Sequence, residues 1–121
     1  MLQVAAVLIA LLGIAHSVLG ERYILIRLFK RDNLPKLFGG TEFTTRTLRF
    51  AWHVTTVAWL GIASILWQAS SGALDRQLVV STIGYTSIAS GFLPLVITRG
   101  RHLSWIVFFV VGGLCLWASA T

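Results

Sequence analysis

The stretch LQVAAVLIALLGIAHSVLG at residues 2–20 decides the fold class of this chain. It holds no acidic or basic residue apart from one histidine, and a helix of this length, rising about 1.5 Å per residue, nearly crosses a hydrocarbon core of about 30 Å. Similar apolar runs follow at residues 48–67, 78–98 and 103–120. We therefore predict one all-α domain over residues 1–121, an integral membrane bundle of four antiparallel transmembrane helices.

The composition agrees with this prediction. Hydrophobic residues make up 56% of the chain and charged residues 12%, whereas soluble domains average about 25% charged residues. No basic residues precede the first run and no clear cleavage site follows it, so we expect a retained helix and not a removable signal peptide. The single cysteine, Cys115, excludes an intramolecular disulfide and a CxxC redox pair.

Nine of the ten basic residues lie in two connectors, at residues 21–47 (with Arg49 at its end) and at residues 99–102. Basic residues are retained in cytoplasmic loops, so we predict a bacterial inner-membrane protein with an N-out/C-out orientation and both termini in the periplasm. This topology accounts for the net charge of +6 without a nucleic-acid partner. The residues expected to bind anionic lipid headgroups are Arg22, Arg27, Lys30, Arg31, Arg46, Arg49, Arg99 and Arg101.

The connector at residues 21–47 begins half apolar, so we expect the first helix to continue into it or to hand over to an amphipathic helix at the interface. Small residues recur along one face of two runs and predict the inner seams of the bundle, because they let helix backbones approach closely. The two stripes are Ala6, Ala10, Gly13, Ser17 and Gly20 in the first run, and Gly84, Ser87 and Gly91 in the third.

His16 and His53 lie inside apolar runs, each within five residues of a charged boundary. Both imidazoles are therefore expected at matching depth, roughly 6–8 Å below that boundary. Ionisable groups inside a span usually face the interior with a partner. We expect both histidines to point inward, and Trp52 and Trp59 to face lipid.

Three interpretations of these histidines stay open. In the first, His16 and His53 ligate a haem, or join Glu21 and His102 around a transition metal such as Zn, Cu, Fe or Ni. In the second, the histidines only satisfy each other, Ser17 or a backbone carbonyl. Glu21 then neutralises a neighbouring arginine, Arg22 or Arg49. In the third, the same residues form a proton or small-substrate site.

The segments AHSVLGER (residues 15–22), LFGG (37–40) and TLRFAWH (47–53) resemble a group of small four-span bacterial inner-membrane proteins of uncharacterised activity. The resemblance covers about the first half of the chain. It implies four spans and an inner-membrane location, and it implies no activity and no site.

With four acidic residues and no Ser–His–Asp set, phosphate-binding loop or carboxylate pair, we predict no catalytic residues. The leading prediction is a non-catalytic accessory or assembly module that contacts lipid, a second copy of itself or a larger membrane complex. The alternative is a metal- or haem-binding membrane protein that uses His16 and His53. The third is a small carrier or enzyme for a lipid-soluble substrate such as a quinone, with Trp52 and Tyr85 beside the histidines.

Overall fold

The computed structural model describes residues 1–121, and its regular secondary structure is entirely helical. The sole strand-like feature is an isolated bridge between Leu37 and Gly40 in a turn. The prediction of an all-α chain is therefore confirmed. The helices are α1 (Leu2–Leu19), η1 (Gly20–Leu25, a π-helix), α2 (Ile26–Leu28), α3 (Glu42–Ser70), α4 (Arg76–Ile97) and α5 (Ser104–Ala120).

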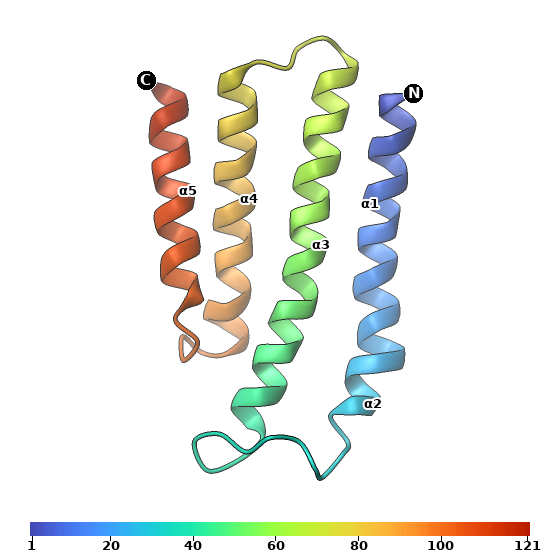
Figure 1. Ribbon diagram of the computed structural model, residues 1–121, viewed down its shortest axis with the longest axis vertical. Helices are drawn as coiled ribbons and strands as arrows, with labels where there is room; N and C mark the ends of the chain where they lie inside the picture. The colour runs from blue at the N-terminus through green and yellow to red at the C-terminus, as the bar shows by residue number, and fades with distance from the viewer.

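The four long helices stand side by side in one row, in the order α1, α3, α4, α5, and each is antiparallel to its neighbour (Figure 1). Close backbone contacts join α1 to α3, α3 to α4, and α4 to α5. No Cα atom of α1 comes within 8 Å of α4 or α5, and none of α3 comes within 8 Å of α5. The predicted antiparallel neighbours are present, but the helices form an open layer and do not close around a common core.

This layer buries little of itself. Only 13 of the 121 residues are buried, and apolar side chains such as Leu8, Val96 and Trp117 are exposed along the helices. Three segments are long and apolar enough to cross a membrane: Leu2–Leu28, Glu42–Ser70 and Arg76–Ile97. Helix α5 is equally apolar but has 17 residues, the lower end of what a span needs. These features are those of a membrane protein, whose apolar surface lipid can cover.

Helix bounds differ from the apolar runs at the basic end. The first helix continues through η1 and α2 to Leu28, as the half-apolar sequence there predicted. Helix α3 begins at Glu42, before the apolar run at residue 48, and its first turn carries an ion pair of 2.6 Å between Glu42 and Arg46. A helix can extend beyond the hydrocarbon region when such i,i+4 pairs support it. Its N-cap residue is Thr41, one of the two threonines, with Thr44, that the sequence offers as a cap for this helix.

The small-residue stripes lie at helix contacts, as predicted. Ala6, Gly13 and Gly20 are buried on the α3 side of the first helix. On α4, a Cβ added at Gly84 would lie 2.9 Å from the Leu116 side chain of α5. These glycines therefore set how closely the helices approach.

The two chain termini and the α3–α4 loop lie at one end of the layer, and the two basic connectors lie at the other (Figure 1). Phe38 and Arg99, in these connectors, adopt left-handed backbone conformations with φ of 57° and 53°. Each is followed by a glycine at positive φ, Gly39 or Gly100, so both reversals are tight, structured turns.

Candidate functional site

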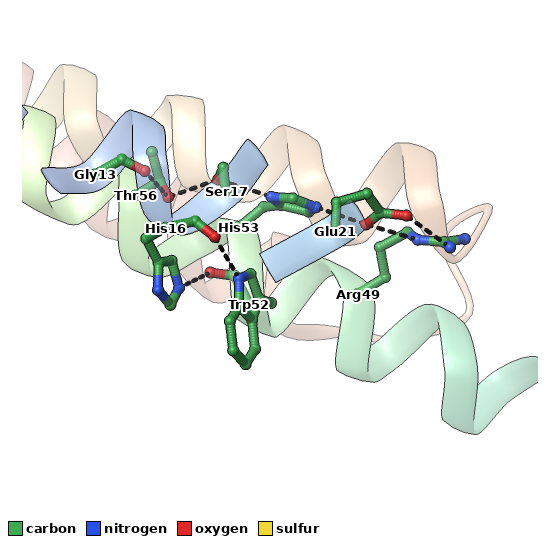
Figure 2. A network of polar contacts seen from close by, with 8 residues as sticks. All are labelled: Gly13, His16, Ser17, Glu21, Arg49, Trp52, His53 and Thr56. Atoms are coloured by element: carbon green, nitrogen blue, oxygen red, sulfur yellow. Dashed lines mark hydrogen bonds and ion pairs between the residues drawn. The ribbon is translucent and has the colours of Figure 1, made fainter. Parts of the chain in front are cut away.

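Two dipeptides meet where α1 packs on α3, His16-Ser17 on α1 and Trp52-His53 on α3 (Figure 2). Neighbouring residues of a helix point about 100° apart, so each dipeptide directs one side chain to either side of the contact. Ser17 meets His53 on one side, and His16 meets Trp52 on the other. The α1–α3 contact therefore carries two separate rows of polar contacts, which we call the first line (on the side of Ser17 and His53) and the second line (on the side of His16 and Trp52).

The first line starts near the middle of the layer. The hydroxyl of Thr56, which is 8% exposed, donates to the backbone carbonyl of Gly13 at 3.0 Å. The same hydroxyl lies 2.6 Å from Ser17 Oγ, and Ser17 Oγ lies 2.8 Å from Nδ1 of His53.

The line continues to the basic end through Glu21. Nε2 of His53 lies 3.1 Å from Oε2 of Glu21. Arg49 donates Nε to the same oxygen at 3.2 Å and places a terminal guanidinium nitrogen 2.8 Å from Oε1. One carboxylate thus receives a two-pronged arginine and an imidazole, the geometry in which charge-assisted hydrogen bonds are strongest. We call these six residues (Gly13, Ser17, Glu21, Arg49, His53 and Thr56) the α1–α3 clasp.

Several groups of the clasp have a definite role as hydrogen-bond donor or acceptor. Thr56 has one hydroxyl proton, which goes to the Gly13 carbonyl, so its oxygen accepts from the Ser17 hydroxyl. Glu21 is held as an acceptor by Arg49 and takes the Nε2 proton of His53. The Glu21 carboxylate thus lies between the Arg49 guanidinium and the His53 imidazole.

The second line joins His16 to Trp52. Their rings stack with centroids 4.5 Å apart and planes 2° from parallel, and Trp59 meets His16 edge-on at 5.2 Å. The Trp52 indole donates to the His16 carbonyl at 3.0 Å, and Nε2 of His16 lies 3.3 Å from the Trp52 carbonyl. The prediction that Trp52 and Trp59 face lipid holds only in part, because both rings contact His16 of α1 while both side chains remain partly exposed.

Gly20 makes the approach of Trp52 possible. A Cβ at this position would overlap the Trp52 indole. The π-helix η1 begins at the same residue, four residues after His16, whose carbonyl accepts the hydrogen bond from the Trp52 indole. The wide turn then carries Glu21 toward Arg49 and His53.

The four predicted metal ligands do not gather in one place. His53 and Glu21 are in the clasp, and His16 lies on the other line, against Trp52. His102 packs in the α4–α5 connector, edge-on to the Phe50 ring with 4.8 Å between centroids and stacked at 5.9 Å on Phe43. No group of three or more His, Cys, Asp and Glu side chains is placed to hold a metal ion.

The structure instead matches the contacts of the second interpretation. His53 bonds Ser17, His16 bonds a backbone carbonyl, and Glu21 pairs with Arg49 rather than with Arg22. Sequence reasoning named these residues and placed Thr56 on the same helix face as Arg49 and His53, but did not include Thr56 in the candidate site. The signal was its position at i+3 from His53 and i+7 from Arg49, on one face of α3.

Ser17, His53 and Glu21 also form a hydroxyl–imidazole–carboxylate line, a set that the sequence analysis did not predict. In hydrolases such a line serves a hydroxyl that is open to substrate, beside free N–H donors for the oxyanion. Here the Ser17 hydroxyl is engaged between His53 and Thr56 inside the helix contact. The arrangement ties two helices together.

The predicted headgroup ligands fall into two classes. Arg46 and Arg49 are paired with carboxylates, at 2.6 and 2.8 Å. The other six, which include Arg22 and Arg27, form no ion pair.

Comparison with protein-family models, curated proteins and solved structures finds no match to this chain.

Proposed function

We propose that this protein is a small non-catalytic module of the bacterial inner membrane that works by packing against other membrane helices, in copies of itself or in a partner protein. The observation that carries this proposal is the single layer of helices. Helices α3 and α4 each have two helical neighbours, yet both broad faces of the layer lie open. In lipid, such faces associate with other helices through close packing and interhelical hydrogen bonds.

The open faces carry groups suited to such association. Between α3 and α4 runs a groove of about 400 Å³ lined in part by hydroxyl side chains, those of Ser64, Thr82, Tyr85 and Thr86. Tyr85 is 66% exposed. Ser64, Thr82 and Thr86 already form hydrogen bonds within the chain. The Tyr85 hydroxyl does not, and it gains from a partner helix because lipid tails offer it no hydrogen bonds.

The engagement of the clasp also supports a non-catalytic role. Each of its polar side chains already has a partner within the chain, so its evident task is to fix α1 on α3. The N-out/C-out orientation, supported by the basic residues at one end of the layer, completes the proposal. The metal- or haem-binding alternative and the quinone alternative stay predictions from the sequence. Elemental analysis and oxidised and reduced absorption spectra of untagged protein distinguish them from the proposal.

Photo-crosslinking in intact membranes tests the proposal. A photoreactive phenylalanine analogue replaces one exposed aromatic residue at a time, Tyr85 on α4 or Trp117 on α5, which are 66% and 70% exposed. We expect a discrete protein adduct from at least one position, with the mass of a second copy or of a defined partner. Adducts with lipid alone, at both positions and at physiological expression, would refute the proposal.

A further inference from the structure

A second groove runs along the first helix, on the side of the α1–α3 contact that carries His16 and Trp52. It encloses about 450 Å³. Its walls are almost entirely apolar, with Leu12, Leu19 and Ile24 along the helix and the Trp52 indole as the opposite wall. Near its basic end the groove is bordered by Tyr23.

Two unpaired cations stand at that end. The guanidinium carbons of Arg22 and Arg27 lie 5.5 and 5.7 Å from the centroid of the Tyr23 ring. Neither arginine forms an ion pair, because Glu21, the acidic neighbour of Arg22 in the sequence, is held by Arg49. The groove is therefore apolar along its length and ends at two positively charged side chains that have no ion-pair partner.

The length of the groove fits one leaflet. From Leu12 to Ile24 the helix rises roughly 18 Å at 1.5 Å per residue, slightly more than half of a hydrocarbon core of about 30 Å. In the proposed orientation Arg22 and Arg27 lie at the cytoplasmic headgroup level, where anionic lipids concentrate. The apolar part then descends along the acyl chains of the same leaflet.

We infer that this groove binds one anionic phospholipid, with an acyl chain along Leu12, Leu19 and Trp52 and its phosphate between Arg22 and Arg27. Charge complementarity selects this occupant. A neutral lipid-soluble molecule would fill the groove but leave both guanidinium groups without a counter-charge. The inference rests on the membrane orientation of the proposed function, and it assigns to two of the predicted headgroup ligands a defined site.

Native mass spectrometry tests the inference. The protein is released from nanodiscs that contain equal amounts of phosphatidylglycerol and phosphatidylcholine, and the lipids retained per chain are counted. We expect one retained phosphatidylglycerol in preference to phosphatidylcholine. The double variant Arg22→Gln/Arg27→Gln should reduce that preference about thirtyfold, since the contributions of the two basic side chains to anionic-lipid binding add.

Two further variants separate a site from general attraction. Arg99→Gln/Arg101→Gln removes the same charge from the other basic connector and should keep the preference. Ala15→Phe places a ring in the groove without changing charge, and should reduce the retention of lipid. The circular dichroism of each variant is checked first, and Ala15→Leu replaces Ala15→Phe if the latter does not fold.

Equal losses in the two arginine double variants would overturn the inference, as would full lipid retention in the groove-filling variant. The crosslinks at Tyr85 and Trp117 report on α4 and α5, away from this groove. Failure of the lipid site with those protein crosslinks intact would therefore leave the packing proposal standing, and the reverse result would remove only the packing proposal.

Discussion

Replacing Thr56 by valine removes the inner end of the clasp while keeping the shape of the side chain. The Thr56 hydroxyl is 3.0 Å from the Gly13 carbonyl and 2.6 Å from the Ser17 hydroxyl. The variant loses both interhelical hydrogen bonds at a position that is 8% exposed, where no solvent replaces them. Ser17 keeps only its bond to His53.

The expected cost follows from these two bonds. Interhelical side-chain hydrogen bonds in membrane proteins are worth about 0.6 kcal/mol on average and at most about 1.7 kcal/mol each. Two of them give a loss of about 1.2 kcal/mol in the free energy of unfolding, with an upper bound of about 3.4 kcal/mol. A loss of this size changes the ratio of folded to unfolded protein roughly eightfold.

The assay is equilibrium unfolding in mixed micelles, in which sodium dodecyl sulfate separates the helices and tryptophan fluorescence follows the transition. The matched control is Thr55→Val, because Thr55 bonds only to the Ala51 carbonyl of its own helix, at 3.5 Å. The control should change stability by less than about 0.5 kcal/mol. Equal effects of the two variants would refute the clasp as a source of stability. Combined with Ser17→Ala, Thr56→Val should be clearly non-additive.

Two other substitutions test the rest of the site. Gly20→Ala pushes a methyl group into the Trp52 indole and should destabilise the protein by about 1–3 kcal/mol in the same titration. The control Gly113→Ala should be neutral or stabilising, because no atom lies within 4 Å of the added carbon. Similar effects of both variants would contradict the packing argument. Glu21→Gln removes the carboxylate 2.8 Å from Arg49 and should cost about 1 kcal/mol, with the difference from wild type shrinking in 1 M salt because the pair is partly exposed. A loss that salt does not change would point to steric disruption instead.

The apolar runs predicted the helices because hydrocarbon thickness demands long uncharged segments. Hydropathy does not register a helix that extends beyond the lipid, so the signal for the start of α3 at Glu42 is instead the capping residue type at Thr41. The hydropathy pattern did not indicate the open row of helices either. A leucine that faces lipid and one that faces another helix have the same hydropathy, so the pattern cannot tell a closed bundle from a layer.

The site was predicted in part for a related reason. The prediction of matching depth placed His16 and His53 at the same level, because antiparallel helices put equal distances from a shared boundary side by side. Both lie at the α1–α3 contact, but on opposite sides of it, so that His16 bonds the Trp52 carbonyl and His53 bonds Ser17. The partial error over Trp52 came from assigning α3 one inward face. A helix in the middle of a row has a neighbour on each side, and Trp52 lies on the flank of the α1 contact next to His53.

The order of the helices in the row also bears on how the chain is made. Each long helix packs only on the segment synthesised before it and the one synthesised after it. Every contact in the layer can therefore form as soon as the later helix enters the membrane, without waiting for a distant part of the chain. Assembly can proceed by adding one helix at a time, each packing on the one inserted before it, and α5 needs only α4 in place to find its position.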